Sequence, residues 1–330
     1  MGGDVPRILI AEERDFSPAA LDLLRKIGRV TLADLGRDDL LRSVRDADVL
    51  WVRLRNRVDE SVLKAAPALK IIVTPTTGLN HIDLAAADRR GILVLSLRGE
   101  TAFLRDVRAT AEHTIGLMLA LFRRLPSAAS HVREGGWERD PFRGSELYGK
   151  TIGIVGYGRL GRIVARYLAP FDVSLCAADP LRMSGTHDGG VKFVPLPDLL
   201  RQADIVTIHV NLIPETRRFF GREQFHQLKR GSSLVNTARG ELIDEHALVD
   251  ALNEGRLAGA ALDVLTDEDT TGMSGNPLVC YSREHDNLII TPHIGGCTRE
   301  SMEKTEVFLA ERLLRVLSAD ASPPSLQRDV

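Results

Sequence analysis

Apolar, strand-like runs alternate with helical patterns along two long stretches of this chain. In the first hundred residues such runs occupy residues 6–13, 29–34, 48–53, 69–75 and 92–97, with helical patterns between them. A second series begins at Thr151 and continues to His293. Strands that alternate with helices pair in parallel, and the helices cover both faces of the sheet. The alternation therefore predicts an α/β fold with two parallel-sheet domains.

One long helical pattern, residues 101–125, links the two series and is followed by Pro126. Proline lacks a backbone N–H and cannot continue a helix, so we expect the helix to end there. A final helical pattern covers residues 298–317.

Charge and apolar length exclude several classes of partner. The net charge of the 330 residues is −2, which gives no general attraction for nucleic acid. The longest apolar stretch, Ile115–Phe122, is far too short to span a membrane, and the N-terminus lacks the features of a signal peptide. Cys176, Cys280 and Cys297 are scattered and lack metal-ligand spacing. We expect reduced thiols, a cytoplasmic location and no metal site.

A glycine fingerprint, GYGRLG at residues 156–161, stands between an apolar run and a helical pattern. Gly156 permits a tight turn, Gly158 lets a pyrophosphate approach the backbone, and Gly161 lets the helix pack against the strand. The first N–H groups of the helix then face the phosphates. The context predicts a dinucleotide-binding unit.

Asp179 ends the next apolar run, eighteen residues after Gly161. A carboxylate in this place accepts hydrogen bonds from the ribose hydroxyls and repels a 2′-phosphate. We therefore expect NAD rather than NADP. The alternative is a surface aspartate before the turn-forming Pro180.

His293 stands in LIITPHIGG, residues 288–296, between a strand-like run and two glycines. An isolated histidine is by default a turn or core residue. Its surroundings change that interpretation, because the blocks NTARG (236–240), GAALDV (259–264) and TPHIGG (291–296) follow the fingerprint in order. With these blocks the sequence resembles the D-isomer-specific 2-hydroxyacid dehydrogenase family over nearly its whole length.

The resemblance implies a domain plan and an activity. It implies a flavodoxin-like substrate-binding domain made of residues 1–100 plus 297–330, and a Rossmann NAD-binding domain made of residues 101–296. It also implies a homodimer formed by the nucleotide domain. The implied reaction is hydride transfer between NAD and a small 2-hydroxy or 2-keto acid.

The resemblance further implies a catalytic set of Arg239, Glu268 and His293, and the chemistry of keto-acid reduction fits it. A guanidinium holds the carboxylate and polarises the carbonyl, and a histidine gives a proton to the new alkoxide. A carboxylate orients the imidazole. Asp267 and Asp269 are alternatives for the position of the acid, and a solvated acidic loop is the alternative to a catalytic role.

The remaining site residues follow from the same resemblance. The cofactor-binding set is Gly156, Tyr157, Gly158, Arg159, Leu160, Gly161, Asp179, Pro180, His209, Asn211, Thr237, Ala238, Arg239, Asp263, His293, Gly295 and Gly296. The substrate-binding set is Arg53, Thr77, Gly78, Leu79, Arg239 and His293. Thr77, Gly78 and Leu79 would act through backbone amides on the substrate carboxylate.

Arg53, Arg55 and Arg57 alternate in WVRLRNRVD and suit a second anionic group at the far end of the substrate. Three solvated arginines are the alternative. His113, on an apolar helical pattern, is interpreted as structural.

Two other functions remain open. A formate-type or phosphite-type dehydrogenase has the same fold, although Glu268 argues against the formate type, which pairs its histidine with an amide. An NAD-sensing, corepressor-like binding protein would differ by its lack of turnover.

Overall fold

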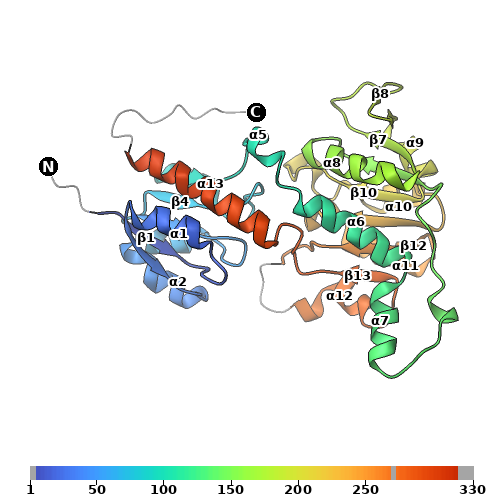
Figure 1. Cartoon of the computed structure of the whole chain (residues 1–330), viewed down its shortest axis with the longest axis horizontal. Coiled ribbons are helices and arrows are strands. Elements are labelled where there is room, and N and C mark those ends of the chain that lie inside the picture. Colours follow the sequence, from blue (N-terminus) through green and yellow to red (C-terminus); the bar gives the residue numbers. More distant parts are fainter. Residues whose placement is uncertain (1–4, 269–272, 319–330) are drawn as a thin grey trace. The chain divides into compact units, whose positions relative to one another are not determined.

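A computed structural model describes residues 5–268 and 273–318 (Figure 1). The chain forms two compact units, which we call the first unit (Met1–Leu104 with Arg299–Val330) and the second unit (Arg105–Thr298).

The first unit is built on a five-stranded parallel sheet in the order β2-β1-β3-β4-β5, which is the flavodoxin-like order. The strands are β1 (Arg7–Ile10), β2 (Arg29–Leu32), β3 (Val49–Trp51), β4 (Ile71–Val73) and β5 (Leu93–Leu95). Its helices are α1 (Pro18–Arg25), α2 (Arg37–Ser43), α3 (Glu60–Ala65), α4 (Leu84–Arg89), α5 (Thr101–Leu104) and α13 (Arg299–Ser318). The last helix, α13, returns to this unit and lies beside α1 (Figure 1).

The second unit contains an eight-stranded sheet in the order β13-β12-β11-β10-β6-β7-β9-β8, parallel except for the β8–β9 pair. The strands are β6 (Thr151–Val155), β7 (Ser174–Ala178), β8 (His187–Asp188), β9 (Val191–Phe193), β10 (Ile205–Ile208), β11 (Ser232–Asn236), β12 (Leu257–Leu262) and β13 (Leu288–Ile290). The helices are α6 (Ala109–Phe122), α7 (Leu125–Arg133), α8 (Arg159–Leu168), α9 (Leu196–Gln202), α10 (Arg222–Gln227), α11 (Glu245–Asn253) and α12 (Pro277–Ser282).

Strand β6 lies at the switch point of this second sheet, because the chain continues to β7 on one side and later to β10 on the other. Ligands of doubly wound sheets bind outside the carboxyl ends of the strands at such a point. The predicted α/β fold with two parallel-sheet domains, the second a Rossmann domain, is confirmed.

The expectation of one helix over residues 101–125 was wrong. The chain forms α5 and α6, with residues 105–108 between them, and the boundary between the two units lies at this break. Pro126 does not end the pattern but stands in the first turn of α7, where its missing N–H costs nothing. Arg124, in a left-handed conformation (φ 52°), separates α6 from α7.

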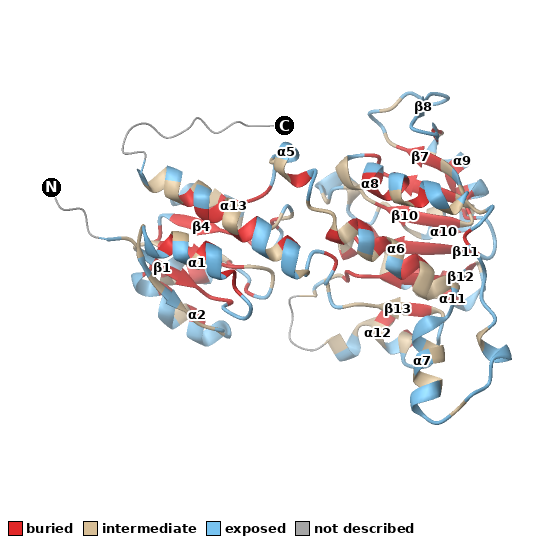
Figure 2. Cartoon of the chain, viewed as in Figure 1, coloured by how far each residue is buried: buried red, intermediate tan, exposed pale blue. Residues whose placement is uncertain are grey.

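Apolar side chains of the strands and of the covering helices form the interior of each unit, as the red strands of Figure 2 show. Strand β10 is buried at all four of its residues, and β3 at all three. Continuous burial is expected for parallel strands covered on both faces.

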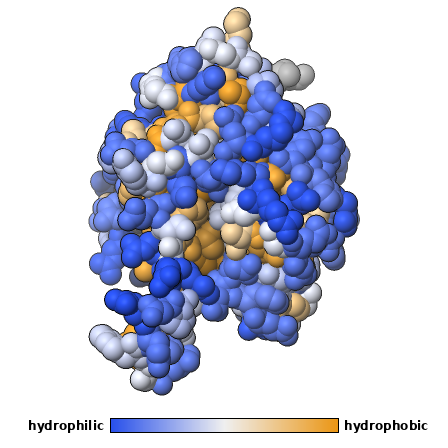
Figure 3. All heavy atoms as spheres, turned by 90° about the vertical axis from the view of Figure 1, so that its right-hand side faces the viewer, coloured by the Kyte–Doolittle hydropathy of each residue, from blue (hydrophilic) through white to orange (hydrophobic). Residues whose placement is uncertain are grey.

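No helix within residues 5–268 and 273–318 combines the length and the apolar character that crossing a membrane requires. Hydrophilic residues predominate on the face drawn in Figure 3, and the apolar residues there show in separate places.

Candidate functional site

His293 lies in a tight turn directly after β13. Its backbone is left-handed (φ 52°), which is uncommon for a residue with a side chain, and its N–H donates to the carbonyls of Asp263 (2.8 Å) and Thr291 (3.0 Å). The Nδ1 atom lies 2.6 Å from Oε1 of Glu268, and the two side chains are 22% and 23% exposed. The turn therefore presents an imidazole that is oriented by a carboxylate and is still accessible.

Glu268 is thus the acid that the structure brings to His293. Asp267, the preceding alternative, has a left-handed backbone (φ 55°), and Asp269 lies outside the described residues. The roles of Glu268 and His293 in catalysis stay predictions.

Asp263 holds this turn from the end of β12. Its carboxylate, in a side chain 1% exposed, accepts the N–H groups of Ile294 (2.9 Å) and Gly295 (2.7 Å) and the hydroxyl of Thr291 (2.6 Å). Burial alone would raise the pKa of Asp263, but the hydrogen bonds outweigh it and hold the pKa below its ordinary value. The carboxylate is therefore charged, and it fixes the turn that carries His293.

His113, on α6, completes this group. Its Nε2 lies 3.2 Å from Oδ1 of Asp263 and 3.0 Å from the hydroxyl oxygen of Thr291. The interpretation of His113 as structural did not include a place beside Asp263. Because Thr291 donates its hydroxyl proton to Asp263, the Nε2–H of His113 can donate to both oxygens.

Arg239 follows β11 in a loop that Asn236 closes from inside. The buried Asn236 donates from Nδ2 to the carbonyl of Arg239 (2.8 Å) and accepts from the N–H of Ala238 (3.0 Å). Arg239 is half-buried, and its Nη1 donates to the Ala238 carbonyl (2.6 Å). A Cβ on Gly240 would lie 2.0 Å from the carbonyl carbon of Leu265, so only glycine lets this loop meet the segment that leads to Glu268.

The fingerprint glycines have the geometry that their predicted roles require. Gly156 has φ +89° and no room for a Cβ, which would lie 2.6 Å from the His209 carbonyl oxygen. A Cβ on Gly161 would lie 2.3 Å from the Gly156 carbonyl oxygen, whereas one on Gly158 would meet nothing within 4 Å. Gly158 therefore leaves open space at the N-terminus of α8, where a pyrophosphate would bind.

Asp179 follows β7, beside the fingerprint. Its carboxylate accepts the N–H groups of Tyr157 (2.7 Å) and Leu181 (2.9 Å), so two backbone donors hold it at the end of the strand. Tyr157 is buried edge-on against Phe193, with ring centroids 5.1 Å apart. The residues present thus suit a dinucleotide at its pyrophosphate and at its adenosine ribose.

The other predicted cofactor residues lie in the second unit at or after strand ends. His209 follows β10, and its Nε2 lies 3.0 Å from the Thr207 hydroxyl. Thr237 is buried, and its hydroxyl lies 2.8 Å from that of Thr114 on α6. Asn211 is exposed, and its carbonyl accepts from Thr216 (2.7 Å). Arg159, Leu160, Pro180 and Gly296 are placed by the fingerprint helix, the β7 end and the His293 turn.

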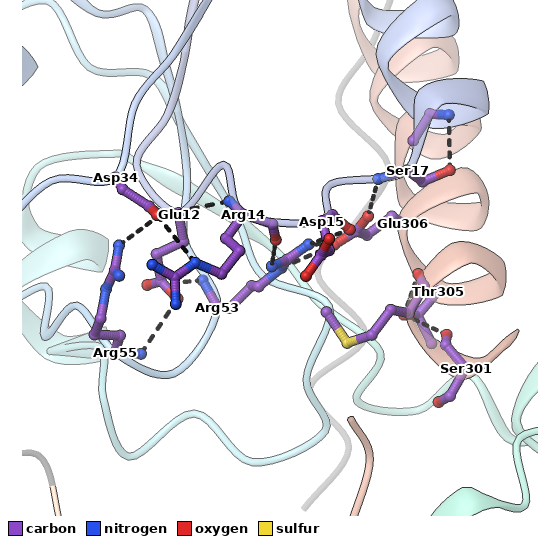
Figure 4. Close-up of polar contacts among 12 residues, drawn as sticks. Glu12, Arg14, Asp15, Ser17, Asp34, Arg53, Arg55, Ser301, Thr305 and Glu306 are labelled. Atoms are coloured by element: carbon purple, nitrogen blue, oxygen red, sulfur yellow. Dashed lines mark hydrogen bonds and ion pairs between the residues drawn. The ribbon is translucent and has the colours of Figure 1, made fainter. Parts of the chain in front are cut away.

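The predicted substrate residues of the first unit follow two neighbouring strands. Thr77, Gly78 and Leu79 come after β4, and within the described part of the chain no hydrogen bond uses their backbone N–H groups. Arg53 comes after β3, where its guanidinium is paired with Glu306 of α13 (Figure 4). Their part in substrate binding stays a prediction.

Sequence reasoning missed the residues that hold the site in place. These are Asn236, Gly240, Glu245, Thr291 and His113. Glu245 accepts the Thr266 N–H (2.6 Å) and Nδ2 of Asn276 (2.8 Å), which anchors the segment before Glu268. Asn236 and Gly240 belong to a quoted motif block, so their positions were visible and their function was not.

Comparison with known proteins gives consistent likenesses. Residues 115–295 match the model described as D-isomer specific 2-hydroxyacid dehydrogenase, NAD binding domain. The chain is 39% identical over 300 residues to a glyoxylate reductase of Thermofilum pendens, with 89% of this chain and 85% of the relative covered. It is 38% identical over 304 residues to a D-3-phosphoglycerate dehydrogenase of Methanocaldococcus jannaschii, with 91% and 56% covered.

Among solved structures, a D-lactate dehydrogenase of Aquifex aeolicus complexed with NAD and lactic acid superposes with a TM-score of 0.80. The identity is 26%, and 95% of this chain and 96% of that one are covered. The chain spans 56% and 57% of the length of two phosphoglycerate dehydrogenase relatives, so each of those proteins contains further sequence.

Proposed function

Because the chain belongs to the D-isomer specific 2-hydroxyacid dehydrogenase family, we propose that it is an NAD-dependent oxidoreductase that interconverts a D-2-hydroxy acid and its 2-keto acid. The observation that carries the proposal is the contact of 2.6 Å between Nδ1 of His293 and Oε1 of Glu268. In this contact Glu268 would orient His293 as the proton donor, on the unit whose residues 115–295 match the NAD binding domain model.

The cofactor would be held by the fingerprint turn, the N-terminus of α8 and Asp179. When bound, NADH supplies the hydride from C4 of its nicotinamide to C2 of the keto acid. Asp179 would accept hydrogen bonds from the adenosine ribose and exclude a 2′-phosphate. The open space at Gly158 supports this assignment.

The chain's own residues would handle charge and protons. Arg239 would hold the substrate carboxylate and polarise the keto oxygen, because its forked N–H donors match such oxygens. His293 would donate a proton from Nε2 to the oxygen on C2, while Glu268 accepts the hydrogen bond from Nδ1–H and stabilises the charged ring. Backbone amides of Thr77, Gly78 and Leu79 would assist at the carboxylate.

The test is NADH oxidation by the purified full chain with a panel of 2-keto acids. We expect turnover with at least one member and far weaker turnover with NADPH. Tight NADH binding without turnover on any keto acid would instead favour the sensor-like alternative. Oxidation of formate or phosphite in preference to any hydroxy acid would favour those dehydrogenase types. The formate type is disfavoured, because His293 contacts a carboxylate and not an amide.

We assign a homodimer to the segment that begins with α7. No residue of α7 is buried, and Leu125 (51%) and Val132 (49%) are exposed along it. Beyond the helix, Trp137 is 86% exposed and Tyr148 is 70% exposed. Large exposed apolar and aromatic side chains on one segment are typical of an interface. Light scattering should give a dimer for the wild type and a smaller mass for Trp137→Ser.

The cytoplasmic location is part of the same proposal. Cys176, Cys280 and Cys297 are free thiols, and burial raises the pKa of Cys176 to about 11. Cys176 therefore stays protonated and unreactive at neutral pH. Unpaired thiols suit a reducing compartment.

A further inference from the structure

Glu306 is a buried carboxylate at the strand ends of the first unit. It lies on α13, and its side chain is 0% exposed. Its Oε1 accepts Nε (2.9 Å) and Nη2 (2.5 Å) of Arg53, and its Oε2 accepts the N–H of Ser17 (2.7 Å) (Figure 4). Both oxygens are thus occupied by donors from the sheet side of the unit.

Arg53 has little left to offer a ligand. Nη1 donates to the carbonyl of Arg14 (2.7 Å), Nη2 also reaches the carbonyl of Asp15 (3.4 Å), and its backbone N–H donates to Glu12 (3.2 Å). The side chain is 17% exposed. Burial raises the pKa of Glu306, and Arg53 and the Ser17 amide act against that rise. The guanidinium is therefore matched in both charge and hydrogen bonds.

The neighbouring arginine is matched in the same way. Nη2 of Arg55 lies 2.9 Å from Oδ1 of Asp34, and Nε of Arg14 lies 3.7 Å from Oδ2 of the same residue. Glu12, 6% exposed, accepts the N–H groups of Arg55 (3.3 Å) and Asn56 (3.0 Å). Two arginines of the cluster, Arg53 and Arg55, are thus each paired with a carboxylate of their own unit.

The location of the pair connects it with substrate choice. Arg53 follows β3, and the segment Thr77–Leu79 follows β4, which is the parallel neighbour of β3. The carboxyl ends of neighbouring parallel strands lie at one edge of a sheet, where ligands bind. Arg53 therefore stands at the same edge of the sheet as the amides assigned to the substrate carboxylate.

We propose that Glu306 determines the substrate class by withdrawing Arg53 from substrate binding. The favoured 2-keto acids then have an uncharged far end and carry no phosphate or second carboxylate. The inference rests on the proposed function. An anionic group brought to this edge would lose water and find a guanidinium already neutralised by a buried carboxylate, so its desolvation would not be offset.

The experiment measures kcat/KM with NADH for two sets of substrates on the full chain. Glyoxylate, pyruvate and hydroxypyruvate have uncharged far ends, whereas 3-phosphohydroxypyruvate and 2-oxoglutarate have anionic ones. The wild type should prefer the first set. Glu306→Gln keeps the shape and an acceptor for Ser17 but removes the charge, so it should shift the ratio of the two sets toward the anionic substrates by about tenfold or more.

Two control variants sharpen the test. Glu303→Gln makes the same chemical change at an exposed position of α13 and should leave the ratio unchanged. Adding Arg53→Gln to Glu306→Gln should remove the gain, because the released guanidinium is then absent.

A wild-type preference for the anionic substrates would overturn the inference while leaving the proposed function intact, and this measurement decides even if Glu306→Gln does not fold. A folded Glu306→Gln with an unchanged ratio would also overturn it. No turnover with any keto acid would overturn the proposed function and the inference together.

Discussion

Both units end their parallel strands in a polar cluster organised by a buried carboxylate, but the clusters leave different groups accessible. In the second unit Asp263 is 1% exposed and takes its hydrogen bonds from backbone amides, a hydroxyl and His113. In the first unit Glu306 is 0% exposed and takes most of its hydrogen bonds from a guanidinium. The same device therefore positions a reactive side chain in one unit and neutralises a charged one in the other.

The two clusters differ in the hydrogen-bond donors that the buried carboxylate binds. Backbone N–H groups are neutral and do not act as acids. A carboxylate that binds them therefore leaves the side chains of the site available for catalysis. Asp263 thereby positions His293, which stays 22% exposed with Glu268 beside it. The ion pair of Arg53 and Glu306 has no net charge, so it offers little attraction to an anionic ligand. Accessibility of a charged group is thus decided by its partner and not by its place at a strand end.

The largest expected effect is on the accessible side of this comparison. His293→Ala should lower kcat by about 10²–10⁴-fold, the usual contribution of a positioned acid, while NADH binding stays almost unchanged. Steady-state kinetics and fluorescence titration with NADH measure both.

His246→Ala is the matched control, because His246 is an exposed histidine of the same unit. It should leave kcat as it is. Near wild-type turnover of His293→Ala on the best keto acid would show that the proton comes from another group.

The second largest effect compares the buried network around Asp263 with the one around Glu12. Asp263→Asn should destabilise the fold by about 3–5 kcal/mol, as the loss of a buried, hydrogen-bonded charge does, and should lower kcat because the His293 turn loosens. Glu12→Gln should destabilise the first unit, since Glu12 accepts from Arg53, Arg55 and Asn56, but should act on KM more than on kcat. Thermal unfolding and kinetics on the same samples separate the two.

If both variants lowered kcat by the same factor, the distinction between a positioning network and a neutralising network would fail. If Asp263→Asn lost stability with full kcat, the turn would not depend on its carboxylate.

The fold and the positions of the motifs could be predicted from the sequence, because both depend on local patterns of residues. Strand and helix periods predicted two parallel sheets, and each fingerprint glycine has the open or crowded surroundings that its role needs. The break at residues 105–108 was missed, because the helical pattern continues across the boundary between the units.

Partners distant in sequence could not be predicted. Arg53 and Glu306 are 253 residues apart, and no period or motif connects them. Asp263 and His113 are 150 residues apart, so an apolar helix with one histidine gave no sign of a contact with the site. Pairing across such separations is decided by the packing of whole elements, here α13 beside the first sheet and α6 beside β12.

A third and smaller effect concerns the cofactor. Asp179 is held by backbone amides, as Asp263 is, so its outward lone pairs should remain available. Asp179→Ala should weaken NADH binding and improve NADPH use by about tenfold, because a 2′-phosphate then meets no carboxylate. The ratio of kcat/KM for NADH and NADPH measures this. A wild type that uses NADPH equally well would contradict the assignment.

The last prediction concerns the acid sensitivity of the second unit. Burial lowers the pKa of His209 to about 3, and its Nδ1 has no hydrogen-bond partner within the described residues. The unfolded chain takes up a proton at His209 near pH 6.5, whereas the folded chain does so only near 3, so this stabilisation is complete above about pH 6.5 and is lost as pH falls toward 3.

His209→Gln should therefore show a flatter fall of the free energy of unfolding between pH 7 and about 4 than the wild type, by at most about 1.4 kcal/mol per pH unit. His246→Gln, at the exposed histidine, should follow the wild type. Hydrogen exchange at acid pH localises the effect, because the unit that opens first loses protection first. The variant should keep more protection than the wild type in residues 105–268 and 273–298, and a gain confined to the first unit would contradict this assignment.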